Sequence, residues 1–411
     1  MTLLSAFALI ITLSAILSFI NNKWLKLPST IGVMTLSILI GITLKITEQF
    51  YPEQIAPIRE NLSSFNFSSF VLDIVLCFLL FAGSMHVNWS DLKETKSTVL
   101  SFATVGTLLS TLIIGFLAKW ILTAMGYNVN LINCLLFGAL ISPTDPIAVI
   151  GILTKYSIPK KLKMEIVGES LFNDGVGVVL FTIIYTVMQL GVDSITGSAI
   201  FEIFCLEVFG GIGVGLIVGY CGYLFIRFID HYQTEVLITL AIVTGGYSIA
   251  NLVHASGPLA MVVAGLLIGN RGKALGMSDI TASYVDKFWE LMDEICNTIL
   301  FVLMGLEVFL LPFELNYLFS GLLFIVLALF ARFISLFPTY MLFNKNEKNK
   351  FLGLKVLTWG GLRGGISIAL ALSLKDASPN GGLFLVITFC IVVFSILIQG
   401  LSISKLLKKY N

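Results

Sequence analysis

The sequence predicts an all-α polytopic membrane protein with about thirteen transmembrane helices. Three observations predict this fold class. Hydrophobic residues make up 57% of the 411 residues and charged residues only 12%, a composition that excludes an ordinary soluble domain. The apolar residues are gathered in stretches of roughly 20, the length that crosses a bilayer. The later stretches also repeat the spacing of earlier ones, at offsets of 216 to 222 residues.

Thirteen predicted spans lie between charged residues and Pro or Gly breaks. In order they cover residues 2–20, 28–46, 69–88, 97–123, 130–153, 165–190, 199–227, 234–253, 257–271, 287–312, 317–343, 352–374 and 381–406. The first span lacks a basic segment and a small-residue cleavage site, so we expect it to be retained. The whole chain, 1–411, is predicted to form one membrane domain, with no soluble C-terminal domain.

The basic residues predict the orientation. With the N-terminus outside, nineteen of the 25 Lys and Arg residues fall in inside loops or in the C-terminal tail. Only Lys45, Arg59, Lys119 and Lys375 fall outside. Because Lys and Arg concentrate on the cytoplasmic side, we expect an outside N-terminus and a cytoplasmic C-terminus in the inner or plasma membrane.

The repeated spacing predicts an inverted repeat. Spans 3 to 6 begin near residues 69, 97, 130 and 165, and spans 10 to 13 begin near 287, 317, 352 and 381. The copies are seven spans apart, which is an odd number, so they must face opposite sides of the membrane. This arrangement is typical of secondary transporters.

Spans 5 and 12 correspond in this repeat, and each carries an interruption. Span 5 contains two prolines around an acid in Ser142–Pro146, and span 12 contains four glycines around a base in Gly360–Gly365. Proline removes a backbone donor and glycine permits unwound backbone. Paired broken helices indicate a binding site near the bilayer midplane. Helix ends carry partial charges, which Asp145 could compensate at converging N-termini and Arg363 at converging C-termini. Two unrelated kinks are the alternative.

Span 6 carries the densest group of polar residues, Gly168–Gly175, at the head of an otherwise apolar run. On a helix Ser170 and Asp174 are four residues apart and share a face, and Asn173 lies three residues from Ser170. Ionisable groups in a membrane helix cost about 2.5–3.5 kcal/mol each on insertion scales and usually mark an ion or proton path. A polar network that joins helices is the alternative interpretation.

Other charged residues in the spans are less informative. Arg332 is alone in span 11 and needs a partner, for which Glu169 is the unassigned acid. Asp73 and Glu307 fit structural or path roles equally well. The isolated His86, His231 and His254 are expected to be solvated or structural, and the six scattered cysteines to be packing residues. No motif indicates a cofactor, a metal-ligand cluster or a nucleic-acid partner.

Six motifs resemble those of the sodium/proton exchanger family, the monovalent cation:proton antiporters of the electroneutral Asn-Asp type. One position departs from the family pattern, because Ala82 stands where many relatives carry Glu. The motifs are Leu80–Met85, Ser142–Pro146, Gly168–Gly175, Ser256–Ala260, Leu300–Glu307 and Gly360–Gly365.

The resemblance implies a transport domain (spans 3–6 and 10–13) beside a dimerisation domain (spans 1–2 and 7–9), elevator-like movement and a homodimer. It also implies the site residues. Asp174 would carry the exchanged ion, with Ser170 and Thr144 as further Na⁺ ligands and Asn173 completing or supporting the site. In support, Glu169 would pair with Arg332, while Asp145 and Arg363 would stabilise the unwound crossing.

Elementary electrostatics predicts the same mechanism. Desolvation favours the protonated form of a buried carboxyl group, whereas a bound cation favours the ionised form, so Asp174 can hold H⁺ or a cation in turn. Only one acid is then free to exchange, which predicts electroneutral one-for-one transport. Hard oxygen ligands suit Na⁺ or Li⁺. A K⁺/H⁺ exchanger and a cation channel remain alternatives. An intramembrane enzyme using Ser170 or Glu169 is disfavoured, because no His lies in a span near the motif.

Overall fold

The computed structural model describes residues 3–145, 156, 158–191, 194–312, 314–345, 349–375 and 377–408, and this part of the chain contains helices and no strand. The first half contains α1 (Leu3–Ile20), α2 (Ser29–Phe50), α3 (Pro52–Ser63), α4 (Phe67–Ser69), α5 (Leu76–Met85), α6 (Trp89–Ser101), α7 (Thr107–Ala124), α8 (Leu131–Ile141) and α10 (Lys160–Leu190). The second half contains α11 (Gly197–Cys205), α12 (Gly211–Arg227), α13 (Tyr232–Leu252), α14 (Gly257–Leu267), α15 (Lys273–Gly276), α16 (Asp279–Leu310), α17 (Leu315–Phe343), α18 (Lys350–Gly360), α19 (Gly365–Lys375), α20 (Gly381–Phe394) and α21 (Gly400–Leu407). Short π-helical segments join α4 to α5, α6 to α7, α11 to α12, α14 to α15 and α20 to α21.

The prediction of an all-helical, multi-spanning protein is confirmed. Within the described ranges, ten helices are long and apolar enough to cross a membrane, and the bent pair α18–α19 makes up to eleven. The count of thirteen also needs the short apolar helix α8 and the partly charged helix α16, and it stays a prediction. So does the orientation of the termini. Pro146 and the rest of predicted span 5 up to residue 153 lie outside the described residues.

Several helices begin well before the apolar stretches that predicted them. α16 begins at Asp279, where Ser278 caps it through a 3.3 Å hydrogen bond from the Thr281 N–H to its Oγ. α6 begins at Trp89 and is capped in the same way by Asn88. A side-chain acceptor satisfies an N–H that the first turn leaves unpaired. These charged first turns are therefore helical although hydropathy alone does not detect them.

The helix in span 12 is interrupted in the middle. α18 ends at Gly360, α19 begins at Gly365, and their axes are bent by 47°. In span 5, α8 ends at Ile141 and the backbone of Ser142–Asp145 is not helical. The two non-helical segments touch each other, because the Asp145 N–H donates a 2.8 Å hydrogen bond to the Leu362 carbonyl oxygen.

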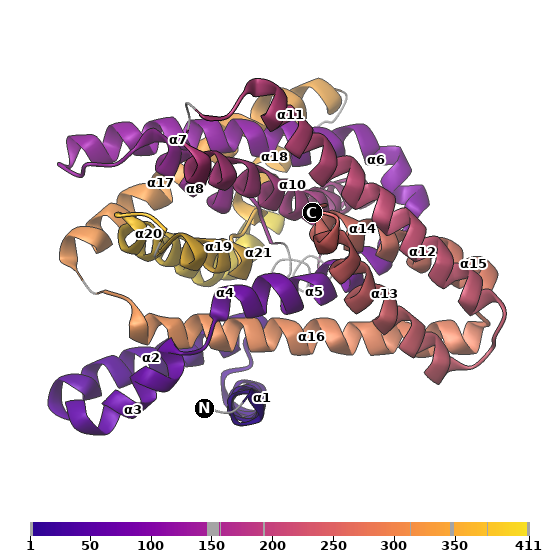
Figure 1. The fold of residues 1–411 in the computed structure, drawn as a ribbon, viewed down its shortest axis with the longest axis horizontal. Helices are drawn as coiled ribbons and strands as arrows, with labels where there is room; N and C mark the ends of the chain where they lie inside the picture. The colour runs from indigo at the N-terminus through magenta and orange to yellow at the C-terminus, as the bar shows by residue number, and fades with distance from the viewer. Residues whose placement is uncertain are drawn as a thin grey trace.

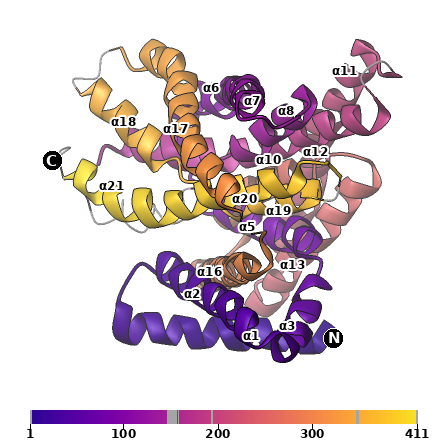
Figure 2. The same cartoon turned by 90° about the vertical axis from the view of Figure 1, so that its left-hand side faces the viewer.

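The helices pack in two neighbouring groups (Figure 1 and Figure 2). In one, α16 packs against α2, α1 and α5, and α14 packs against α5, α12 and α13. In the other, α17 packs against α7, α18 and α20, and α19 against α8 and α20. Figure 2 shows α1, α2 and α16 together on one side of the molecule and α17 and α18 on the other, with α20 between them. α10 lies between the groups and contacts α6, α8 and α14.

Small residues allow α2 and α16 to approach closely. A Cβ atom at Gly41 would lie 2.5 Å from the carbonyl oxygen of Gly305, and a Cβ atom at Gly305 would overlap the side chain of Ser37. Ser37 and Gly41 are one turn apart on α2. Small residues at such spacing are a common basis of helix association in membranes, where lipid removes the hydrophobic driving force.

We predict that Gly305→Ala lowers the thermal stability of the purified protein, because its methyl group overlaps α2. Overpacking of this kind costs about 1–3 kcal/mol. The matched control is Gly245→Ala in α13, where no atom lies within 4 Å of the added Cβ. Since alanine is the better helix former, the control should keep or raise the unfolding temperature. Equal unfolding temperatures for the two variants in detergent would contradict this account.

Candidate ion-binding site

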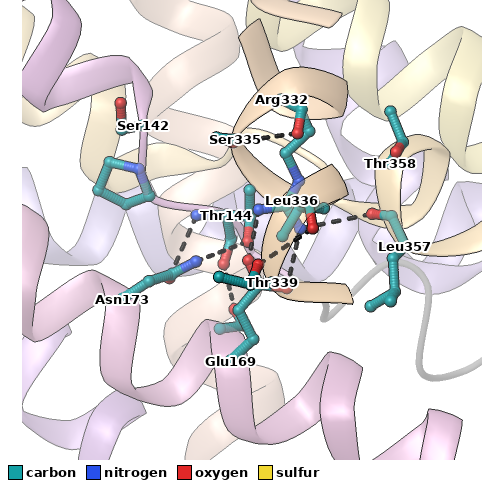
Figure 3. Close-up of polar contacts among 12 residues, drawn as sticks. Ser142, Thr144, Glu169, Asn173, Arg332, Ser335, Leu336, Thr339, Leu357 and Thr358 are labelled. Carbon is teal, nitrogen blue, oxygen red and sulfur yellow. Dashed lines mark hydrogen bonds and ion pairs between the residues drawn. The ribbon is translucent and has the colours of Figure 1, made fainter. Parts of the chain in front are cut away.

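The polar residues of α10 hold the non-helical segment of span 5. Asn173 Nδ2 donates a 2.8 Å hydrogen bond to Thr144 Oγ1, and Asn173 Oδ1 accepts a 3.3 Å hydrogen bond from the Thr144 backbone N–H. Ser170 Oγ donates to the Thr144 carbonyl oxygen. All three residues are buried. Figure 3 shows Asn173 and Thr144 facing each other across this contact. Thr144 is therefore bound to α10 through its N–H, its carbonyl group and its side chain.

The close approach of this segment also depends on a glycine that the sequence analysis did not single out. A Cβ atom at Gly177 would overlap the ring of Pro143. Gly177 lies one turn beyond Asn173, so the same face of α10 offers hydrogen bonds at one turn and space at the next. In the sequence, Gly177 follows Asp174 by three residues, so the two lie on the same side of a helix. The reason for a glycine at this position is its contact with Pro143, which only the structure reveals.

Asp174 differs from its neighbours. It is buried, at 9% exposure, yet its carboxylate makes no hydrogen bond and no ion pair within the described part of the chain. Another acid, Asp145, lies within electrostatic range of it. Thr144 Oγ1 and Ser170 Oγ belong to the same cluster and have lone pairs available beyond the bonds described above. Ser170 lies one turn before Asp174 on α10, and its hydroxyl group binds Thr144. An uncommitted carboxylate on the same helix as these neutral oxygen atoms is the kind of donor set that a hard monovalent cation or a proton would use.

The predicted partner of Arg332 is present. The guanidinium group of Arg332 and the carboxylate of Glu169 form a buried ion pair, with NH1 bonded to Oε1 and NH2 donating a 3.0 Å hydrogen bond to Oε2. Arg332 NH2 also donates a 3.4 Å hydrogen bond to the Leu357 carbonyl oxygen in α18. Figure 3 shows Arg332 reaching from α17 toward Glu169 on α10. The pair ties α10, α17 and α18 together on one side of the crossing.

Arg363 and Asp145 lie where the two interrupted spans cross. Arg363 NH1 donates hydrogen bonds to the carbonyl oxygens of Ser142 and Pro143, at the C-terminal end of α8. The Arg363 backbone N–H donates a 2.9 Å bond to Ser395 Oγ. The carboxylate of Asp145 lies against Gly364, just before the N-terminus of α19. A base thus lies at a helix C-terminus and an acid at a helix N-terminus, the signs that oppose the helix dipoles.

Other residues from the sequence analysis lie apart from this cluster. Asp73 is exposed on the segment between α4 and α5, and Glu307 is half-buried in α16. Ala82, the residue that departs from the expected family motif, is fully buried in α5. His86 lies 3.9 Å from Asp286 at the end of α5. Ser395 and the carbonyl group of Leu357 had no recognisable sequence signal, since serine and an ordinary leucine are common in apolar helices.

Comparison with known proteins gives a consistent result over the whole chain. A family profile described as "Sodium/hydrogen exchanger, transmembrane" matches residues 8–409. The chain is 44% identical over 412 aligned residues to a protein named Na(+)/H(+) antiporter NhaP from Pseudomonas aeruginosa, with 99% of this chain and 97% of that protein covered. It is 34% identical over 398 residues to the Na(+)/H(+) antiporter NhaH of Halobacillus dabanensis, covering 94% and 93%.

The fold is shared with a solved structure. The sodium proton antiporter MjNhaP1 from Methanocaldococcus jannaschii, at pH 8, superposes with a TM-score of 0.76 and covers 99% of this chain and 98% of its own. Its sequence identity is 22%. The family profile and the relatives extend over the interrupted spans and the cluster around Asp174. The chain belongs to the sodium/hydrogen exchanger family.

Proposed function

We propose that this protein exchanges a monovalent cation, Na⁺ or Li⁺, for H⁺ across the membrane, with Asp174 as the residue that carries either ion. The observation that supports the proposal is that the polar residues near Asp174 in α10 are already bonded to other groups. Asn173 and Ser170 are bound to the crossing, and Glu169 is paired with Arg332. Asp174 is the acid in this cluster that has neither a base nor a hydrogen bond within the described residues. The family to which the chain belongs supports the same activity.

The chemistry at Asp174 is competition between two cations for one carboxylate. Burial disfavours the bare anion, so the group takes up a proton when no metal cation is present. A bound Na⁺ supplies the compensating charge and displaces the proton. Thr144 Oγ1 and Ser170 Oγ add neutral oxygen ligands of the kind that hard cations prefer. We assign to Asn173 mainly a supporting role, because both of its amide atoms are used by Thr144.

Transport requires that the loaded site faces each side of the membrane in turn. We propose elevator-like movement of a transport domain that contains the crossing against a scaffold that dimerises. Helix packing supports a narrower transport domain than spans 3–6 and 10–13, because α5 and α16 pack mainly against helices of the expected scaffold. The moving unit would then contain α6, α7, α8, α10 and α17 to α21. The N-terminus would lie outside and the C-terminus in the cytoplasm.

Two alternatives differ in measurable ways. A K⁺/H⁺ exchanger would use the same cluster, and the oxygen ligands around Asp174 suit either cation. A cation channel would conduct without saturation at modest cation concentration. Dequenching of a pH-sensitive dye in proteoliposomes, measured in parallel with Li⁺, Na⁺ and K⁺, separates all three. Saturable responses to Na⁺ and Li⁺ support the proposal, whereas a response to K⁺ alone would replace it with the K⁺/H⁺ alternative.

We predict that Asp174→Asn reduces exchange to the background of empty liposomes, because an amide neither releases a proton nor compensates a cation. The protein should remain folded, since Asp174 makes no hydrogen bond that the change would break. Asp279→Asn, at the exposed first turn of α16, is the control and should exchange normally. Na⁺-dependent proton movement at the wild-type rate in Asp174→Asn would show that another group carries the ion.

We predict that Glu169→Ala and Arg332→Ala each lower stability by about 3–5 kcal/mol, because each leaves an uncompensated buried charge. The double variant should recover part of that loss. The control pair is Glu48 and Arg59, which is partly exposed and joined by hydrogen bonds of 2.5 and 2.8 Å. Breaking it should cost less than about 1 kcal/mol. Strictly additive losses at Glu169 and Arg332 would contradict their coupling.

We predict that exchange is electroneutral and therefore indifferent to membrane potential. Asp174 alone changes partners, because Glu169 is already paired with Arg332. An uncompensated charge would feel about 2.3 kcal/mol per 100 mV, so even one extra charge per cycle would be evident. The measurement is Na⁺ or Li⁺ exchange in proteoliposomes clamped by valinomycin at different K⁺ gradients. An equilibrium cation ratio that follows the voltage would reveal a second titrating group, with Glu169 the first to test.

A further inference from the structure

The π-helical segment that joins α20 to α21, Ser395–Gln399, lies against the interruption in span 12. Ser395 Oγ accepts a 2.9 Å hydrogen bond from the Arg363 N–H. Gln399 Nε2 donates a 3.0 Å hydrogen bond to the Trp359 carbonyl oxygen. Both side chains are buried. Because the last carbonyl groups of a helix have no partner within it, Gln399 satisfies one at the end of α18, while Ser395 satisfies an N–H just before α19.

The other interrupted span is held in the same way. Asn173 Oδ1 accepts a hydrogen bond from the Thr144 N–H, as Ser395 Oγ does from the Arg363 N–H. Ser395 lies 222 residues after Asn173, which is within the spacing of the predicted repeat. The π-helical segment therefore supports the crossing from the second half of the chain, as α10 supports it from the first.

Gln399 also lines a small cavity beside the buried ion pair. The space open to the centre of a water molecule there is about 10 Å³. Its polar lining comes from Arg332, Thr358, Arg363 and Gln399, and apolar side chains of α17 and α20 complete the wall. By this measure one bound water molecule needs about 10–15 Å³, so the cavity has the size of a site for a single water molecule.

Arg332 brings an unpaired donor to this cavity. The residue is 6% exposed. Its NH1 and NH2 atoms are bonded to Glu169 and Leu357, but its Nε has no hydrogen-bond partner in the described part of the chain. A Cβ atom at Gly361, which also lines the cavity, would lie 2.5 Å from Nε. Leaving a buried donor unpaired is unfavourable, and more so when the group is charged.

The hydrogen-bonding groups around the cavity match those of a water molecule. Water would accept a hydrogen bond from Arg332 Nε and donate its two hydrogen atoms to Thr358 Oγ1 and Gln399 Oε1. Thr358 Oγ1 itself donates a 2.8 Å hydrogen bond to the Leu354 carbonyl oxygen, which leaves its lone pairs for such a bond. Three hydrogen bonds are typical of a buried water molecule.

Charge disfavours a small anion, although two bases line the cavity. Arg332 is paired with Glu169, and Asp145 accompanies Arg363 at the crossing. An anion would add an uncompensated charge to a buried region in which acids and bases are already balanced. Water satisfies the same donor without adding charge.

We propose that one water molecule is bound in this cavity between Arg332 Nε, Thr358 Oγ1 and Gln399 Oε1. Thr358 and Gln399 then act as positioning residues for the buried ion pair, because the water holds the plane of the guanidinium group and keeps NH1 and NH2 directed at Glu169. The effect on exchange rests on the proposed function. An uncompensated Glu169 charge would oppose movement of the loaded unit across the membrane.

The first test needs no variant. A structure of the wild-type protein at a resolution that shows ordered water should contain a peak within hydrogen-bond distance of Arg332 Nε, Thr358 Oγ1 and Gln399 Oε1. The absence of a peak would overturn the water site. Crystals soaked in bromide test the anion, because bromide replaces chloride and scatters anomalously. An anomalous peak in the cavity would overturn the assignment of water.

The second test measures Na⁺/H⁺ exchange in proteoliposomes, per amount of folded protein. Thr358→Val removes the hydroxyl group and keeps the shape, so it should lower the maximal rate about three- to tenfold, the value of one hydrogen bond. The KM for Na⁺ should stay within about twofold, because Asp174 and its neighbours are unchanged. Thr358→Ser retains the hydroxyl group and should keep the wild-type rate.

The matched control is Thr388→Val in α20. The Thr388 hydroxyl group donates to the Phe384 carbonyl oxygen of its own helix, as that of Thr358 does to Leu354, but Thr388 does not line the cavity. Its loss should leave the maximal rate unchanged. An equal loss of rate in Thr388→Val and Thr358→Val would overturn the positioning role, since any buried hydroxyl group would then have the same effect.

The outcomes separate this inference from the proposed function. If the wild type does not exchange cations for protons, the proposed function fails, and the density in the cavity still decides the water site. If the wild type exchanges normally and Thr358→Val keeps its maximal rate, the positioning role is overturned while the function stands. A loss in Thr358→Ser as large as that in Thr358→Val would overturn it as well, because the hydroxyl group would not be the cause.

Discussion

Backbone that leaves a helix inside a bilayer must find its hydrogen bonds within the protein, and the crossing beside Asp174 depends on this constraint. The carbonyl groups of Ser142 and Pro143, left open where α8 ends, accept hydrogen bonds from Arg363. The Asp145 N–H donates to the carbonyl group of Leu362. Each interrupted span thus supplies the partner that the other lacks. A shift of one segment alone would leave groups of the other without hydrogen bonds, so these bonds hold the two segments together.

The same constraint divides the polar residues of α10 into two roles. Asn173 and Ser170 satisfy the backbone and side chain of Thr144, so their polarity is used to hold the non-helical segment against α10. Gly177 gives Pro143 the space to approach. Asp174, which is adjacent to Asn173 in sequence, makes no hydrogen bond to the non-helical segment. In a polar network that only joined helices, every polar group would have a hydrogen-bond partner. This cluster differs from such a network because the Asp174 carboxylate has no hydrogen-bond partner within the described residues.

Properties that are local in the chain could be predicted from the sequence. Apolar length predicted the helices, and the cost of isolated charges in a bilayer predicted that Arg332 needs an acid such as Glu169. Properties that arise from contact could not. The contacts of Gly177 and Gly305 exist only once helices pack, and Asn173 has the same sequence context whether it binds an ion or Thr144. The sequence analysis placed the start of α16 too late, because hydropathy identifies the apolar part of a helix that lies in the bilayer and not a charged part that extends beyond it.

Charge compensation around the crossing explains how coupling could arise without any further device. Glu169 and Arg332 neutralise each other, and Asp145 and Arg363 bring one charge of each sign to the same crossing. Asp174 has no base of its own among the described residues, so an empty site carries one uncompensated negative charge. Moving that charge across a low-dielectric barrier is far less favourable than moving a neutral site. A proton and a monovalent cation each restore neutrality, and each excludes the other. Under the proposed function the unit would therefore cross when it holds either one, and obligatory exchange would follow from the charge balance itself.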